Sequence, residues 1–150
     1  MDYSKFNNAV NMDEIKAGIE EAKAKSKEFA EIPVKRNYDV VIESMELGES
    51  KKGDPMVKIV FKIIEGEFAK SKIFMNQVVK KGIQIHILNE FLRSLDSGVD
   101  VGFEDYQQYG MMLEDIFDAI DGKFEYKLHY GENSSGYKTY NIKEIYELDE

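Results

Sequence analysis

The sequence has 150 residues, 43% of them hydrophobic and 33% charged, which predicts one buried core under a charged surface. It contains no cysteine, so disulfides, thiolate catalysis and cysteine-based zinc sites are excluded. No apolar stretch reaches the length of a membrane span, and the first residues carry no secretory segment. We therefore expect a cytoplasmic protein with no membrane contact.

The formal net charge of −9 is unevenly distributed along the chain. Residues 35–81 carry ten basic and seven acidic residues, for +3, whereas residues 82–121 carry one Arg and nine acidic residues, for −8. Binding to phosphates depends on the local field, so a negative total does not exclude a nucleic-acid ligand. The alternative is that both biases are solvated surface, which is the commoner reason for a charge run.

Residues 12–30 are rich in Ala, Glu and Lys, which predicts a helix that Asn11 or Asp13 caps. Its apolar positions form only a thin stripe, made by Ile15, Ile19, Ala22 and Phe29. Such a stripe packs weakly on its own domain or contacts a partner chain. Because Pro33 ends the segment, we expect residues 1–32 to form a helical extension that mediates homo-oligomer formation or a contact with a partner.

Alternating apolar and polar residues predict three strands in succession, over 38–47, 56–64 and 72–80. A turn at 48–55 separates the first two strands, and Gly66 marks a turn or bulge before the third. In the second strand, Val57, Ile59, Phe61 and Ile63 share one face, and Lys58, Val60 and Lys62 share the other.

Two helices and a hairpin follow the three strands. Four apolar residues recur at four-residue spacing after Gly82, with Leu88 and Leu92 alongside, and predict the first helix: Ile83, Ile87, Phe91 and Leu95. A second helix is predicted over 104–120. Strands at 123–130 and 137–142 flank a polar loop at 131–136, and residues 143–150 read as a short acidic tail.

Three strands, a helical insertion and two more strands are the order of elements in an OB barrel. We therefore expect residues 33–150 to form a mainly β domain with helices (α+β), an OB-like five-stranded barrel with its helical insertion between strands 3 and 4. A parallel α/β fold is disfavoured, because only turns separate the first three strands.

The segments of the chain after residue 32 also resemble a known family. They are Pro33, Tyr38, DVVIESMEL (39–47), ESKKGDPMVKIVFKIIEGEF (49–68), IFMNQ (73–77), HILNEFLRSL (86–95) and DGKFEYKLHYGENSSGYKTYNI (121–142). In this order they are similar to small proteins from phages and prophages of Gram-positive bacteria, formerly described as a domain of unknown function and now named single-stranded DNA-binding proteins. The resemblance implies a role in phage DNA replication or recombination in the host bacterial cytoplasm, alongside phage proteins of those processes. Members often have a Gly before the first strand's Tyr, where this chain has Arg36-Asn37.

A sequence-tolerant single-strand binder needs cations along the phosphates and aromatic faces that stack on bases. OB folds bind strands across strands 2 and 3 and between the first and last hairpin loops. The residues of the chain that meet these requirements are Lys51, Lys52, Lys58, Lys62, Lys70, Lys72, Phe74, Tyr130, Tyr137 and Lys138. Taken singly, each is equally compatible with a solubilising lysine or a core aromatic.

Two other classes of function stay open. The acidic segment 96–121 could act as a protein-binding face, as in an inhibitor or a DNA mimic. Glu125 and Lys127, downstream of Asp118 and Asp121, could belong to a metal-dependent nuclease. However, acid-x-Lys triplets are common by chance in a charged chain, and alternation points this pair to solvent. We therefore expect no enzymatic activity, no cofactor and no metal.

Overall fold

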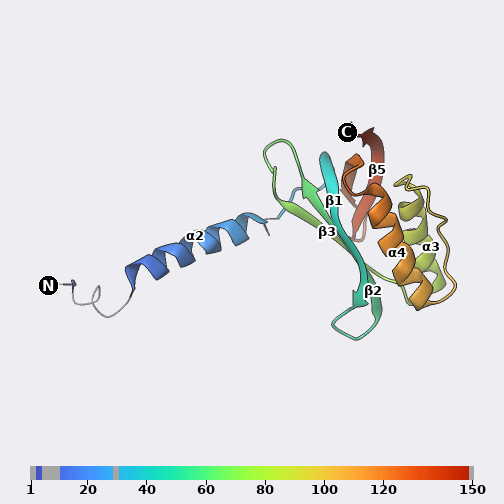
Figure 1. The fold of residues 1–150 in the computed structure, drawn as a ribbon, viewed down its shortest axis with the longest axis horizontal. Coiled ribbons are helices and arrows are strands. Elements are labelled where there is room, and N and C mark those ends of the chain that lie inside the picture. Colours follow the sequence, from blue (N-terminus) through green and yellow to red (C-terminus); the bar gives the residue numbers. More distant parts are fainter. Residues whose placement is uncertain (1–2, 5–10, 29–30, 149–150) are drawn as a thin grey trace. The chain divides into compact units, whose positions relative to one another are not determined.

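The computed structural model describes residues 3–4, 11–28 and 31–148, which divide between two compact units, Met1–Glu31 and Ile32–Glu150. The elements of the described residues, in chain order, are α2 (Met12–Glu28), β1 (Arg36–Glu49), β2 (Pro55–Ile63), β3 (Lys72–Val78), α3 (Gly82–Arg93), α4 (Tyr106–Ile120), β4 (Phe124–Glu132) and β5 (Lys138–Glu147) (Figure 1). The chain is therefore mainly β with helices, as its sequence predicts.

The first unit contains α2, and its start confirms one of the two expected caps. The Asn11 side-chain oxygen accepts hydrogen bonds from the backbone N–H groups of Asp13, at 2.9 Å, and Glu14, at 3.2 Å. Ile15 and Ile19 are 46% and 49% exposed, so this stripe has little cover. Phe29 and the side chain of Ala22, which complete the predicted stripe, lie outside the described residues.

The second unit contains one antiparallel five-stranded sheet in the order β3-β2-β1-β4-β5. β1 pairs with two strands: its residues 36–40 pair with β4, and its residues 40–49 pair with β2. β3 and β5 are the two edges, and within residues 31–148 they do not pair with each other. The sheet is therefore open, and the ring of hydrogen bonds that a closed barrel requires is not observed.

The inner face of the sheet carries the core of this unit. Val57, Ile59, Phe61 and Ile63 of β2 are all fully buried, as the alternation in this strand predicts. The buried hydroxyl of Tyr126 donates a hydrogen bond of 2.8 Å to the carbonyl of Leu95, so this polar atom does not destabilise the interior.

The helices α3 and α4 lie next to one another on one side of the sheet (Figure 1), joined by a hydrogen bond of 2.5 Å from the buried Tyr109 hydroxyl to Asn89 Oδ1. The predicted apolar face of α3 is partly wrong, because Ile83 and Ile87 are 64% and 53% exposed. A turn holds 3.6 residues, so four-residue spacing drifts by about 40° at each step. The other four predicted residues are confirmed as the buried stripe: Leu88, Phe91, Leu92 and Leu95.

The predicted acidic tail is also incorrect over most of its length. β5 continues to Glu147, with Ile145 opposite Tyr126 and Tyr146 opposite Glu125. The alternation of these side chains extends the strand, although acidic residues dominate the composition. A register shift between Lys127 and Leu128 puts Ile142 opposite Leu128 and Ile145 opposite Tyr126 despite their odd spacing, although Ile145 is 37% exposed.

Candidate nucleic-acid interface

The outer face of β2 and β3 brings together four of the predicted site residues: Lys58, Lys62, Lys72 and Phe74. In the register of the two strands, Lys62 is opposite Lys72 and Val60 is opposite Phe74. The Phe74 side chain is 38% exposed, whereas its neighbours Ile73 and Met75 are buried on the inner face. This surface, which we call the β2–β3 face, therefore combines an accessible aromatic ring with cations on both sides along the strands.

The lysines of the β2–β3 face differ in their partners. Lys72 Nζ lies 3.3 Å from Glu43 Oε2, so part of its charge is compensated. Lys58 and Lys62 form no ion pair with any residue of 31–148. The Lys58 side chain lies over Gly48, where an added Cβ would be 3.3 Å from Nζ. In the register of β1 and β2, Lys58 is opposite Glu46, and Gly48 lies two residues closer to the end of β1. The Lys58 ammonium group therefore leans toward the β1–β2 turn.

The β1–β2 turn presents Lys51 and Lys52 as exposed side chains. Hydrogen bonds of 2.8 Å from Ser50 N to the Asp54 carbonyl and of 3.1 Å from Asp54 N to Ser50 Oγ close the turn. Gly53 has a φ of 83°, a conformation that glycine adopts without strain. The backbone therefore holds the loop in shape without using either lysine side chain.

Two further lysines of this region, Lys80 and Lys81, were not predicted as site residues. The predicted third strand extends to residue 80, whereas β3 ends at Val78 and both lysines follow it. Strand pairing puts Met56 opposite Val78, and the Val79 N–H group donates a hydrogen bond of 2.9 Å to the Pro55 carbonyl. The chain leaving β3 is thereby brought beside the β1–β2 turn. The register of β2 and β3 was the only signal that could have revealed this neighbourhood.

The two segments enclose a hollow of about 550 Å³, called the lysine hollow below. Its lining is formed by Ser50, Lys51, Lys52, Asp54, Val78, Lys80, Lys81 and Gln84. Lys80 Nζ lies 3.3 Å from Asp54 Oδ1. Four lysines against one carboxylate give this site a local charge of +3, within a chain of net charge −9.

The remaining predicted residues lie elsewhere. Tyr137, 72% exposed, stands in the β4–β5 loop beside Lys138, whose Nζ is 2.7 Å from Glu132 Oε2. The hydrogen bond from Lys138 and its charge lower the pKa of Glu132. Lys70 is exposed in the β2–β3 loop. Pairing of β1 with β4 and β2 puts the β4–β5 loop and the β1–β2 turn beyond opposite ends of β1.

Tyr130 is not brought to the β2–β3 face. It is half-buried on the inner side of β4, with its ring centroid 5.6 Å from that of Tyr140. Tyr140, which was not predicted as a site residue, stacks on the buried Phe61. Its hydroxyl donates a hydrogen bond of 2.7 Å to the backbone carbonyl of Phe74. Burial raises the pKa of Tyr140. This contact ties β5 to the edge of β3, across the opening of the sheet.

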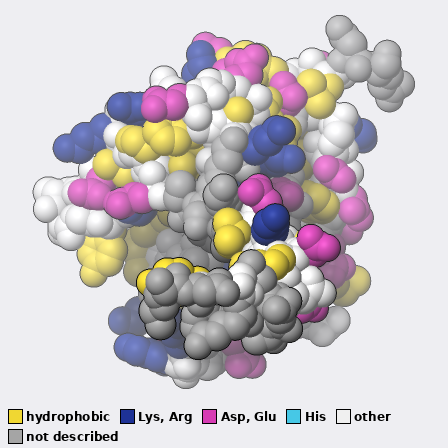
Figure 2. All heavy atoms as spheres, turned by 90° about the vertical axis from the view of Figure 1, so that its left-hand side faces the viewer, with side chains coloured by type: hydrophobic (Ala, Val, Ile, Leu, Met, Phe, Trp, Pro, Cys, Tyr) yellow, Lys and Arg dark blue, Asp and Glu magenta, His cyan; other side chains and the backbone are white. Residues whose placement is uncertain are grey.

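Charges of both signs are interspersed over the face drawn in Figure 2, where Lys and Arg side chains lie among Asp, Glu and hydrophobic groups. An anionic ligand is therefore attracted by local groups of lysines, because salt screens interactions between exposed charges that are more than about 10 Å apart.

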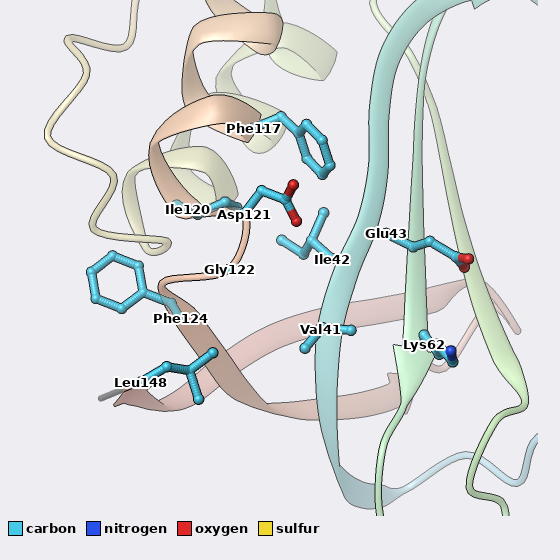
Figure 3. A pocket seen from close by; sticks show the side chains of 10 residues that line it. All are labelled: Val41, Ile42, Glu43, Lys62, Phe117, Ile120, Asp121, Gly122, Phe124 and Leu148. Atoms are coloured by element: carbon cyan, nitrogen blue, oxygen red, sulfur yellow. The ribbon is translucent and has the colours of Figure 1, made fainter. Parts of the chain in front are cut away.

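A second hollow, of about 360 Å³, lies where β1 separates from β4. Figure 3 shows Phe117 and Ile42 pointing toward one another between α4 and β1, with Phe124 and Leu148 at the base and Asp121 beside them. Glu43 and Lys62 lie on the other side of β1. Its apolar walls and its carboxylate make this hollow a poor site for a phosphate group.

The residues of the nuclease alternative are also visible. Lys127 Nζ is 3.6 Å from Glu144 Oε2, and the pKa of Lys127 is raised, first by a hydrogen bond with Tyr146 and then by the charge of Glu144. Within the described residues, no group of three or more His, Asp or Glu side chains is arranged to hold a metal ion. His129 Nδ1 lies 2.7 Å from Asn37 Oδ1.

No helix in the described part of the chain is long and apolar enough to cross a membrane.

Comparison with known proteins identifies a family. A search of curated proteins and a search of solved structures each found no match. The family model described as "Protein of unknown function (DUF669)" matches residues 6–119, so that β4 and β5 lie beyond the matched segment. Because the match spans more than half of the sequence, the chain belongs to the DUF669 family.

Proposed function

We propose that this protein binds single-stranded DNA with little sequence preference and catalyses no reaction on it. The observation that carries the proposal is the β2–β3 face, where the exposed ring of Phe74 lies beside Val60, between Lys58 and Lys62 along the strands. Stacking on unpaired bases and attraction to phosphates are the two interactions that sequence-tolerant single-strand binding requires.

The topology supports the same proposal. The order β3-β2-β1-β4-β5, with two helices between β3 and β4, corresponds to an OB barrel opened between β3 and β5. The hydrogen bond from the Tyr140 hydroxyl to the Phe74 carbonyl spans that opening. We therefore propose an OB-like domain that is partly open, in which β2 and β3 present the binding surface.

Substitution of the two uncompensated lysines of this face tests the proposal. The Lys58→Gln/Lys62→Gln variant should bind labelled oligo-dT more weakly, and the slope of log affinity against log salt should become shallower by about 0.7 for each phosphate that is no longer neutralised. Fluorescence anisotropy over a series of salt concentrations measures both quantities. An unchanged slope would mean that the strand does not cross this face.

A matched control makes the same charge change outside the β2–β3 face. Lys123 and Lys143 are exposed and belong to neither β2 nor β3. The Lys123→Gln/Lys143→Gln variant should keep the wild-type slope. If both variants lower affinity equally, the effect comes from net charge and not from a defined interface.

The biological setting is part of the proposal. The resemblance of the sequence to phage proteins supports action in phage replication or recombination, in the host bacterial cytoplasm and with other phage proteins as partners. The alternative is a protein-binding module, an inhibitor or a DNA mimic, that acts through the acidic segment 96–121. Oligonucleotide would not compete with a partner bound there, whereas it would compete with any ligand of the β2–β3 face.

A further inference from the structure

The lysine hollow is a positive site that the predicted interface did not include as a unit, because only Lys51 and Lys52 of its four lysines were predicted. Its cations come from two segments that are 28 residues apart in sequence, Lys52 in the β1–β2 turn and Lys80 after β3. Pairing of β2 with β3 holds the two segments together through the last residue pairs of its ladder. The cluster is therefore a product of the fold and not of a basic stretch in the sequence.

Charge and accessibility make the hollow suitable for an anion. Asp54 compensates Lys80 at 3.3 Å, while Lys51, Lys52 and Lys81 form no ion pair within residues 31–148. Three like charges that share one concave site repel one another, and a bound anion relieves that repulsion. The volume of about 550 Å³ is ample for a phosphate group with its attached sugars.

The polar lining also presents a hydrogen-bond donor. Gln84 Oε1 accepts from the backbone N–H groups of Lys80, at 3.1 Å, and Lys81, at 2.9 Å. These bonds fix the plane of the side-chain amide and leave its Nε2 group as a donor, because the oxygen end is already occupied. The site thus offers ammonium groups and an oriented amide, the donor types that bind phosphate oxygens.

The hollow lies in line with the β2–β3 face. Along the outer side of β2 and β3, Lys58 is followed by Met56 opposite Val78, and Val78 itself lines the hollow. The Lys58 side chain leans over Gly48 toward the same end of the sheet. Cations consequently continue from the middle of the face to the hollow, as a track for consecutive phosphates requires.

From these observations we infer that the lysine hollow holds a backbone phosphate of the single strand that crosses the β2–β3 face, with Lys51, Lys52, Lys80, Lys81 and Gln84 as its ligands. This inference rests on the proposed function and adds a second binding region to it. Short oligonucleotides occupy the face alone, and longer ones reach the hollow and gain affinity from it.

The Lys52→Gln/Lys81→Gln variant tests the inference and leaves the Lys80–Asp54 pair intact. Affinity for oligo-dT is measured by anisotropy as a function of oligonucleotide length and salt. In the wild type, affinity should rise with length and then level off. In the variant, the gain from length should disappear, and the salt slope should become shallower by about 0.7 for each phosphate that the hollow no longer neutralises. The Lys123→Gln/Lys143→Gln variant should behave as the wild type.

A measurement on the unmodified protein complements the variant. In an NMR titration with long oligo-dT, the amide signals of Lys80, Lys81 and Gln84 should shift, whereas an oligonucleotide too short to leave the face should not move them. A flattened salt slope together with these shifts supports the inference. Unchanged slope and signals, with weakened binding in Lys58→Gln/Lys62→Gln, would overturn the inference and retain the proposed function. Absence of binding by any oligonucleotide would overturn both.

Discussion

Phe74 is the residue on which base stacking at the β2–β3 face depends. Its ring is 38% exposed on β3, so part of its apolar surface is accessible to a base. We predict that Phe74→Ala weakens oligo-dT binding by about 1–3 kcal/mol, the range for one base-aromatic stack, and leaves the salt slope unchanged. Isothermal titration or anisotropy at fixed salt measures this decrease in affinity.

The control for Phe74 is another exposed apolar residue outside the face. Ile87, on α3, is 53% exposed, and Ile87→Ala removes a comparable apolar surface. This variant should bind as the wild type does. Equal affinity of Phe74→Ala and the wild type would contradict stacking at β3 and leave only an electrostatic interaction.

The face of a strand on which a side chain lies could be predicted where apolar and polar residues alternate. The period of two assigned Lys58 and Lys62 to the polar face of β2, and the structure confirms that assignment. The same alternation put Tyr130 on the apolar side of β4, but its position beside a loop suggested a stacking role. The inner packing of Tyr130 against Tyr140 depends on β5, which no local pattern in β4 reveals.

At the scale of elements, the contact between α3 and α4 predicts a pH dependence. Burial raises the pKa of Tyr109 to about 12, from the ordinary value of 10.0. The native state therefore holds this proton more tightly than the unfolded chain, and the stabilisation is complete below pH 10. It should be lost as the pH rises from 10 to about 12, by roughly 3 kcal/mol.

Urea unfolding at a series of alkaline pH values measures this decline. The Tyr109→Phe variant should have a lower free energy of unfolding at neutral pH, because the hydrogen bond to Asn89 is lost. Its further decline above pH 10 should be smaller than in the wild type. Parallel curves for the two proteins would show that Tyr109 is not the group that titrates. Burial also raises the pKa of Tyr126, so some decline should persist.

The helix α2 is expected to mediate self-association or a contact with a partner, and not to stabilise the β domain. Ile15 and Ile19 are about half exposed, and the buried core of the described chain lies entirely in Ile32–Glu150. Deletion of residues 1–31 should leave a domain that unfolds cooperatively and has a smaller number of subunits by light scattering. Loss of cooperative unfolding would show that α2 belongs to the core.

The order of the elements could be predicted, whereas the closure of the sheet could not. Alternation and turn residues determine where strands begin and end, so β1 to β4 were placed from the sequence. Whether β3 and β5 pair depends on the curvature of the whole sheet and on side chains such as Tyr140, which bridges the edges with a single hydrogen bond. The positions of Lys80 and Lys81 beside the β1–β2 turn could not be predicted for a similar reason, because they depend on the pairing register of β2 and β3.

For the whole molecule, the central question is how a chain of net charge −9 attracts a polyanion. The acidic residues concentrate in residues 82–121, while Lys58, Lys62 and the lysine hollow create a local positive field. Such a field is short-ranged in salt, so binding should be strongly salt-dependent.

The most direct test compares labelled oligo-dT with duplex DNA of the same length, by fluorescence anisotropy at two salt concentrations. We predict tighter binding of the single strand at both concentrations, because Phe74 stacks only on unpaired bases, and a marked decrease in affinity at the higher salt. Equal affinity for single strand and duplex at matched salt, or no binding of either, would contradict single-strand binding at the β2–β3 face.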